Sequence, residues 1–170
     1  ELTEAMLSDA GAWRVVADEE ALPFRAHAFD LALSGLGLHW VNDLPGTLLQ
    51  LRHALKPDGL LLGALLGGRT LHELREALAE AELAQEGGLS TRVSPFADVR
   101  DVGALLQRAG FALPIVDSET LTVKYADPWR LRADLRGMGE TNASVHRRRA
   151  FTRRSTLFAA MERYQARFGD

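Results

Sequence analysis

The stretch FDLALSGLGLHWVNDLP, residues 29–45, places polar and aromatic side chains directly behind an apolar run. The run breaks into small residues at Ser34 and Gly35, and His39 and Trp40 follow shortly afterwards. Small residues at the end of a strand let a ligand approach the backbone. We therefore expect this edge to face a bound small molecule. The alternative is that Trp40 simply packs in the core.

A second group of candidate residues follows the run WRVVA, where the acids Asp18 and Glu19 stand. A carboxylate at a strand end can accept hydrogen bonds from the amine or the hydroxyls of a nucleoside. Open parallel sheets bind ligands beyond the carboxyl ends of their strands, so both groups belong to one predicted edge. The alternative for Asp18 is that it caps the following turn.

Several other short motifs lack the residue spacing of the catalytic or binding site that they suggest. HELRE, at His72, has Glu76 where a zinc-protease helix needs its second histidine. GLGLHW lacks the third glycine of a dinucleotide loop, and LSGLG is no nucleophile elbow. The chain has no cysteine, which excludes disulfides and thiolate ligands. We predict no metal site.

The elements that must position these residues follow the pattern of an α/β sheet. Strands are predicted at residues 13–18, 29–35, 60–66 and 111–125. Helices are predicted at residues 3–9, 44–59, 69–88, 97–110, 127–139 and 147–168, with a loop at 89–96. A strand, a helix and a strand over 29–66 predict a parallel crossover.

Composition limits the class of protein. A chain of 170 residues, 46% of them hydrophobic, is long enough for one domain. We predict a single domain over residues 1–170. Within it, residues 70–96 form a helical insertion with its loop, and residues 127–170 form the C-terminal helices. No apolar run reaches the roughly 20 residues that a membrane-spanning helix needs. From Glu140 onward seven arginines face three acids, whereas the rest of the chain is acidic. We therefore expect a soluble protein that does not bind nucleic acid.

The order of VVADEEALPF, FDLALSGLGLHWVND, LRHALKPDGLLLGALLGG and AGF resembles the class I S-adenosylmethionine-dependent methyltransferases, including the biotin-pathway malonyl-carrier-protein methyltransferases. The runs GGLSTRVSPFADVRDVGALLQRAGF and LRGMGETNAS are more narrowly similar to the mitochondrial complex I assembly factor 5 family and its alphaproteobacterial relatives. The resemblance implies a Rossmann-like sheet flanked by helices, S-adenosylmethionine as cofactor, and a bacterial cytoplasmic protein, peripheral to the inner membrane at most.

The resemblance also implies roles for single residues. Glu1 takes the place of the acid that holds the ribose hydroxyls, and Asp18 that of the acid that meets the adenine amine, with the backbone of Glu19 beside the ring. Ser34 and Gly35 match the strand end that touches the methionine part of the cofactor. His39 and Trp40 would line the methyl-facing side, and His39 is the candidate base or orienting group. No catalytic residue is assigned.

The chain departs from the family pattern at both ends. The glycine-rich cofactor loop would lie before Glu1, and the first strands and the last strand of the sheet have no counterpart. We expect a fragment that binds the cofactor very weakly and that either forms oligomers, with strand exchange between copies, or folds poorly.

Three functions stay open at this point. The first is a methyltransferase of unknown substrate. The second is an arginine hydroxylase or assembly factor whose partner is a respiratory complex I subunit, which the narrower resemblance implies. The third is a non-catalytic interaction module.

Overall fold

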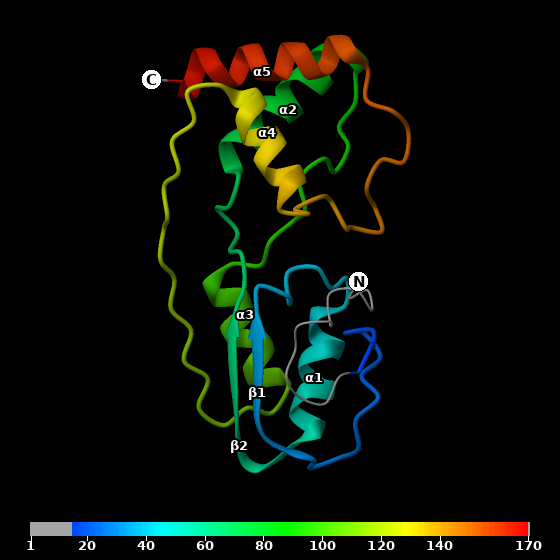
Figure 1. The fold of residues 1–170 in the computed structure, drawn as a ribbon, viewed down its shortest axis with the longest axis vertical. Coiled ribbons are helices and arrows are strands. Elements are labelled where there is room, and N and C mark those ends of the chain that lie inside the picture. The colour runs from blue at the N-terminus through cyan, green and yellow to red at the C-terminus, as the bar shows by residue number, and fades with distance from the viewer. Residues whose placement is uncertain (1–14, 170) are drawn as a thin grey trace. The chain divides into compact units, whose positions relative to one another are not determined.

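The computed structural model describes residues 15–169, and these belong to two compact units (Figure 1). Unit 1 comprises the chain up to Leu66 together with Val99–Val116, and unit 2 comprises Gly67–Asp98 and Asp117–Asp170. The single domain over 1–170 stays a prediction. The helix expected at residues 3–9 lies outside the described residues.

Unit 1 is a mixed α/β structure. Its two strands, β1 (Phe29–Gly35) and β2 (Leu55–Ala64), pair in parallel and are joined by helix α1 (Leu44–Ala54). Helix α3 (Val99–Arg108) packs against α1. The parallel crossover predicted from the sequence is therefore confirmed.

Local signals explain where the helix of this crossover begins and where β2 departs from β1. Asp43 caps α1, because its Oδ1 accepts the backbone N–H of Gly46 at 3.0 Å. The pairing shifts between Phe29 and Leu31, opposite residues 56–59. Within that excursion Asp58 has a φ of 62°, a left-handed conformation that aspartate tolerates better than most residues.

The sheet of unit 1 has two unlike faces. Leu61 packs on a core that is formed by the buried side chains of Leu38, Leu48 and Ala109. On the opposite face the strand register sets Leu31 beside Leu60 and Leu33 beside Leu62. All four of these leucines are about half exposed or more. A parallel strand pair is normally covered on both faces, so this apolar face is unusual.

Unit 2 is helical and consists of α2 (His72–Glu86), α4 (Pro128–Gly137) and α5 (Arg154–Phe168). Helix α5 lies along α2, and α4 packs against α5 (Figure 1). The buried core contains Leu74, Ala81, Leu131, Ala160 and Met161. Helix α2 ends at Gly87, whose φ of 69° is the left-handed conformation expected of a helix-terminal glycine.

Four sequence predictions of secondary structure are wrong. The helix expected at 44–59 ends at Ala54, and residues 55–59 belong to β2. Residues 15–18 of the strand expected at 13–18 form only an isolated bridge, and residues 111–125 form no strand. The apolar residues Leu113 and Ile115 are 90% and 92% exposed. Both segments have strand-like composition but find no partner among the described residues. The last helix begins at Arg154 rather than at residue 147, and the segment before it is irregular.

Candidate functional site

The first candidate site is the edge of unit 1 where β1 ends. Gly35 ends the strand, and Leu36 follows it with a φ of 57° while donating its N–H to the carbonyl of Ala64 at 2.9 Å. The chain then turns, and Trp40 donates its N–H to the Gly37 carbonyl at 3.0 Å. A β-carbon on Gly35 would meet no atom within 4 Å. This edge therefore has open space beside its backbone.

His39 and Trp40 lie together on the turn that follows this edge. Their ring centroids are 5.5 Å apart, the ring planes are inclined at 38°, and both side chains are half-buried. Ser34 is also half-buried, and its Oγ lies 3.4 Å from the position of a β-carbon built on Gly37. The turn thus approaches the end of β1, and it carries the imidazole and indole rings as neighbours.

Asp18 organises a tight turn. Its Oδ1 accepts the N–H of Glu20 at 2.9 Å, and its carbonyl accepts the N–H of Ala21 at 3.0 Å. The turn-capping role that the sequence left open for Asp18 is therefore present. The side chain is also exposed, so a carboxylate that caps a turn here still faces solvent.

The acidic loop at residues 18–22 is tied to α1 and to the turn before it. Glu19 accepts the Thr47 hydroxyl at its carbonyl at 3.2 Å. Gln50 receives the N–H of Leu22 on Oε1 at 2.8 Å and donates its Nε2 to the carbonyl of Glu20 at 2.9 Å. These contacts hold the acidic loop against α1 at Thr47 and Gln50.

Glu20 makes the connection to the β1 edge, and sequence reasoning missed it. Its Oε1 accepts the backbone N–H groups of Asn42 and of Asp43, the latter at 3.3 Å. Asn42 and Asp43 belong to the stretch that contains His39 and Trp40. The structure therefore links the acidic loop to the turn that follows β1. The only sequence signal was the third acid of the run DEE. Glu1 lies outside the described residues.

A second polar cluster, which sequence reasoning also missed, is buried in unit 2. Glu82 is 2% exposed and accepts hydrogen bonds on Oε1 from Arg92 at 2.8 Å and from Arg148 at 2.9 Å. Ser90 donates its N–H and its hydroxyl to the same carboxylate at 2.8 and 2.6 Å. The signal was present in α2, because Glu82 stands eight positions after buried Leu74 and therefore on the apolar stripe.

The donors around Glu82 determine its protonation. Burial alone would raise the pKa of Glu82, but the hydrogen bonds from Arg92, Ser90 and Arg148 outweigh it and lower the pKa from 4.5 to about 2. Glu86 lies one turn further along α2, and its pKa is lowered by hydrogen bonds from the Thr156 hydroxyl, at 2.7 Å, and from Arg148. Both carboxylates are therefore ionised at neutral pH, and their charges are matched by the two arginines.

Metal-ligand clusters and membrane-spanning helices are both absent from residues 15–169. No group of three or more histidine or acidic side chains in this range is placed to hold a metal ion. Within the same range, no helix is both long enough and apolar enough to cross a membrane.

Comparison with known proteins defines the class. Residues 1–63 match the family described as "Methyltransferase domain". The chain is 34% identical over 157 residues to "Putative methyltransferase RP459" of Rickettsia prowazekii, which covers 92% of this chain and 69% of that protein. It is 42% identical over 135 residues to a malonyl-[acyl-carrier protein] O-methyltransferase of Halorhodospira halophila, covering 79% of this chain and 44% of that enzyme. The chain belongs to the methyltransferase-domain family.

Within that family the chain also matches a more particular group. It is 46% identical over 163 residues to the mitochondrial arginine-hydroxylase NDUFAF5 of Danio rerio, which covers 96% of this chain and 50% of that protein. The chain thus spans about half the length of this relative.

Proposed function

We propose that the intact protein is an arginine hydroxylase that acts on a respiratory complex I subunit. The observation that carries this proposal is the identity to the arginine-hydroxylase group, which is higher than the identity to the methyltransferases and extends over nearly the whole chain. The subunit is implied by the sequence resemblance to the complex I assembly factor family. That resemblance also supports a bacterial cytoplasmic protein that works at the inner membrane surface.

We further propose that the protein binds S-adenosylmethionine at the carboxyl edge of a Rossmann-like sheet to which β1 and β2 belong. The exposed carboxylate of Asp18 suits the adenine amine, and the open backbone at Gly35 suits the methionine part. Ser34 lies at the same strand end, and the linkage through Glu20 supports a single site. When bound, this cofactor would supply an electrophilic methyl group, which serves methylation; hydroxylation would need a separate oxidant that supplies the oxygen atom.

The Glu19 backbone has a narrower role in this proposal than the sequence suggested. Its carbonyl already accepts the Thr47 hydroxyl at 3.2 Å, which fixes the loop on α1. The Glu19 carbonyl oxygen has a second lone pair, but the hydrogen bond from Thr47 fixes the orientation of the peptide plane and therefore the direction of that lone pair. Glu19 therefore positions the acidic loop, and Asp18 remains the group that contacts the adenine.

Methylation is the second candidate function, and the match to the methyltransferase domain favours it. Methyl transfer is an in-line displacement, so the residues of this chain would act mainly by positioning. His39, half-buried beside Trp40, is the group placed to orient an acceptor or to take its proton. A binding-only assembly role is the remaining alternative.

Mass spectrometry of complex I subunits distinguishes these functions. Insertion of one oxygen atom adds about 16 Da to an arginine-containing peptide, and a methyl group adds about 14 Da. Because oxygen insertion consumes an oxidant, the experiment compares whole cells with and without the gene. We expect the modified peptide to lose about 16 Da in the deletion strain and to regain it with the wild-type gene.

The same cells separate the alternatives. A loss of about 14 Da would replace hydroxylation with methylation. Complex I that fails to assemble while all its arginine peptides keep their masses would overturn both reactions and leave the assembly role. Complementation with the Asp18→Ala gene tests whether the modification depends on the proposed cofactor residue.

A further inference from the structure

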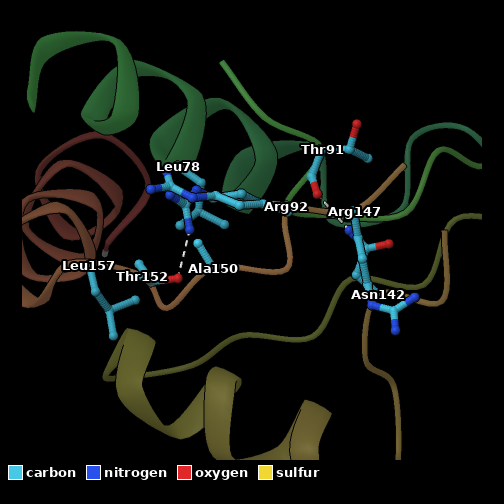
Figure 2. Close-up of a pocket in the computed structure, with 9 residues that line it drawn as sticks. Leu78, Thr91, Arg92, Asn142, Arg147, Ala150, Thr152 and Leu157 are labelled. Atoms are coloured by element: carbon cyan, nitrogen blue, oxygen red, sulfur yellow. Dashed lines mark hydrogen bonds between the residues drawn. The ribbon is translucent and has the colours of Figure 1, made fainter. Parts of the chain in front are cut away.

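A pocket of about 210 Å³ lies in unit 2, between α2 and the irregular segment that precedes α5 (Figure 2). Figure 2 shows Arg92 and Thr152 on one side of it and Arg147 and Asn142 on the other. The pocket is outside the acidic loop and the β1 edge, and the proposed reaction gives it no role. Its lining is Leu78, Thr91, Arg92, Asn142, Arg147, Arg148, Ala150, Thr152 and Leu157.

Arg92 lines this pocket and has one buried hydrogen-bond donor without an acceptor. Its side chain is only 10% exposed; Nη1 donates to the Thr152 hydroxyl at 2.7 Å, and Nη2 donates to Glu82 at 2.8 Å. The buried Nε has no acceptor among residues 15–169. A buried donor without an acceptor is unfavourable, but Nε is not accessible to solvent, so a ligand would contact it only after the Arg92 side chain moved.

Arg147 contributes a positive charge that the cluster does not neutralise. Arg92 and Arg148 both pair with Glu82 and Glu86. Arg147 is exposed, and the contact of its guanidinium within the described part of the chain is with the Ser144 carbonyl at 3.2 Å. The pocket is therefore lined by three arginines, and two of them are neutralised by the carboxylates of Glu82 and Glu86. The charge of Arg147 remains for an anionic ligand.

A second, larger pocket of about 410 Å³ continues from the first one. The two pockets share Leu78, Thr91 and Arg92. The second pocket is lined in addition by the apolar side chains of Leu89, Val93, Pro95 and Phe96. Pockets for whole small molecules usually reach about 300–1,000 Å³. The first pocket is therefore the size for one acidic side chain, and the second has room for an apolar neighbour.

We propose that these two pockets bind an acidic peptide segment, with a carboxylate at Arg147 and Arg92 and an adjacent apolar side chain between Leu89 and Phe96. A charge-assisted hydrogen bond to a guanidinium is stronger than one between neutral groups, which favours a carboxylate over an amide. The proposal does not depend on the reaction proposed above, because none of the predicted cofactor residues takes part.

Fluorescence anisotropy on the intact protein tests this proposal. The probe is a labelled Gly-Asp-Phe-Gly peptide, and its matched control has asparagine in place of the aspartate. We expect the acidic peptide to bind at least about fivefold more tightly than the amide peptide, and the difference to shrink as salt rises. Arg147→Gln should weaken binding of the acidic peptide about three- to tenfold.

Arg149→Gln is the matched control, because Arg149 stands two positions along and is also exposed but does not line either pocket. It should leave the affinity unchanged. Equal binding of the two peptides, or equal losses in the two arginine variants, would overturn the proposal. Inorganic phosphate that displaces the peptide completely at equimolar concentration would show a general anion site, and this too would overturn the assignment to a peptide.

Discussion

The two units use charged side chains in opposite ways. In unit 1 the acids of the 18–22 loop are at least partly exposed and their hydrogen bonds go mainly to backbone N–H groups. In unit 2 the carboxylates of Glu82 and Glu86 lie against arginines and a threonine of the same unit. A buried carboxylate with all its partners supports the fold, whereas an exposed one on a fixed loop remains available to a ligand.

This comparison predicts the largest stability loss for Glu82→Gln. The substitution keeps the shape of the side chain but removes the charge that faces Arg92 and Arg148, and breaking a buried ion pair typically costs about 3–5 kcal/mol. Because Arg148 is partly exposed, we expect about 3 kcal/mol for unit 2. Hydrogen exchange of the α2 amides measures this loss.

Glu80→Gln is the matched control on the same helix. Glu80 pairs with Arg167 at 2.9 Å, but both side chains are more than half exposed. An exposed pair is worth about 1 kcal/mol or less. If the two variants lose equal stability, the buried cluster is no more important to unit 2 than a surface ion pair.

The same cluster predicts a pH dependence in acid. The pKa of Glu82 is about 2 in the folded protein and 4.5 as its ordinary value, so the unfolded chain binds the proton first as the pH falls. The stabilisation by Glu82 is therefore complete above about pH 4.5 and is lost as the pH falls toward about 2. Urea unfolding of the wild type and of Glu82→Gln measures it.

Glu82→Gln should have a flatter stability profile than the wild type across that range. The lowered pKa of Glu86 acts in the same direction, so some dependence should persist in the variant. Parallel profiles for the two proteins would contradict the assigned role of the Glu82 charge.

The exposed leucines of unit 1 predict association. Leu33 is 69% exposed and lies beside Leu62 on the uncovered face of the parallel pair. A polypeptide limited to these 170 residues should form oligomers, and Leu33→Lys should shift it toward monomers in light scattering. Leu113→Lys is the control, because Leu113 is 90% exposed but stands outside the sheet. Oligomers that persist equally in both variants would contradict association through this face.

A smaller effect is expected at Leu36, directly behind β1. Its φ of 57° is unfavourable for a side chain other than glycine, and half of the leucine is exposed. Leu36→Gly should therefore stabilise unit 1 by up to about 1 kcal/mol, whereas Leu49→Gly inside α1, which is similarly exposed, should destabilise it by about 1 kcal/mol. Thermal unfolding of both variants gives the comparison. A loss of stability in Leu36→Gly would show that the leucine contacts outweigh the backbone strain.

The sequence predicted the elements whose signals are local. Apolar residues located β1 and the second half of β2, whereas residues 55–59 of β2 were predicted as the end of a helix. An Asp-Pro pair located the start of α4. The prediction of a strand at residues 111–125 was wrong. Alternating apolar residues show only that a segment is suited to a strand, and a strand forms only when another backbone pairs with it. The same reason applies to residues 15–18.

The candidate site residues also divide into those with a local sequence signal and those defined by long-range contacts. Asp18, Ser34, Gly35, His39 and Trp40 were found because they follow apolar runs and match a family pattern, and their roles stay predictions. Glu20 was missed because its partners stand 22 and 23 positions later. The Glu82 cluster was missed because Arg148 stands 66 positions away along the chain. Contacts at such separations follow from the fold and not from spacing.

The proposed cofactor site depends most on the contact between Asp18 and the adenine amine. Calorimetric titration of the intact protein with S-adenosylmethionine tests it, with Asp117→Ala as the control, because Asp117 is another exposed acid that accepts a local backbone N–H, at 2.7 Å. We predict that the wild type and Asp117→Ala bind alike and that Asp18→Ala binds about 10-fold more weakly, as expected when a hydrogen bond to a charged group is lost. No binding by the wild type, or unchanged affinity in Asp18→Ala, would contradict the account.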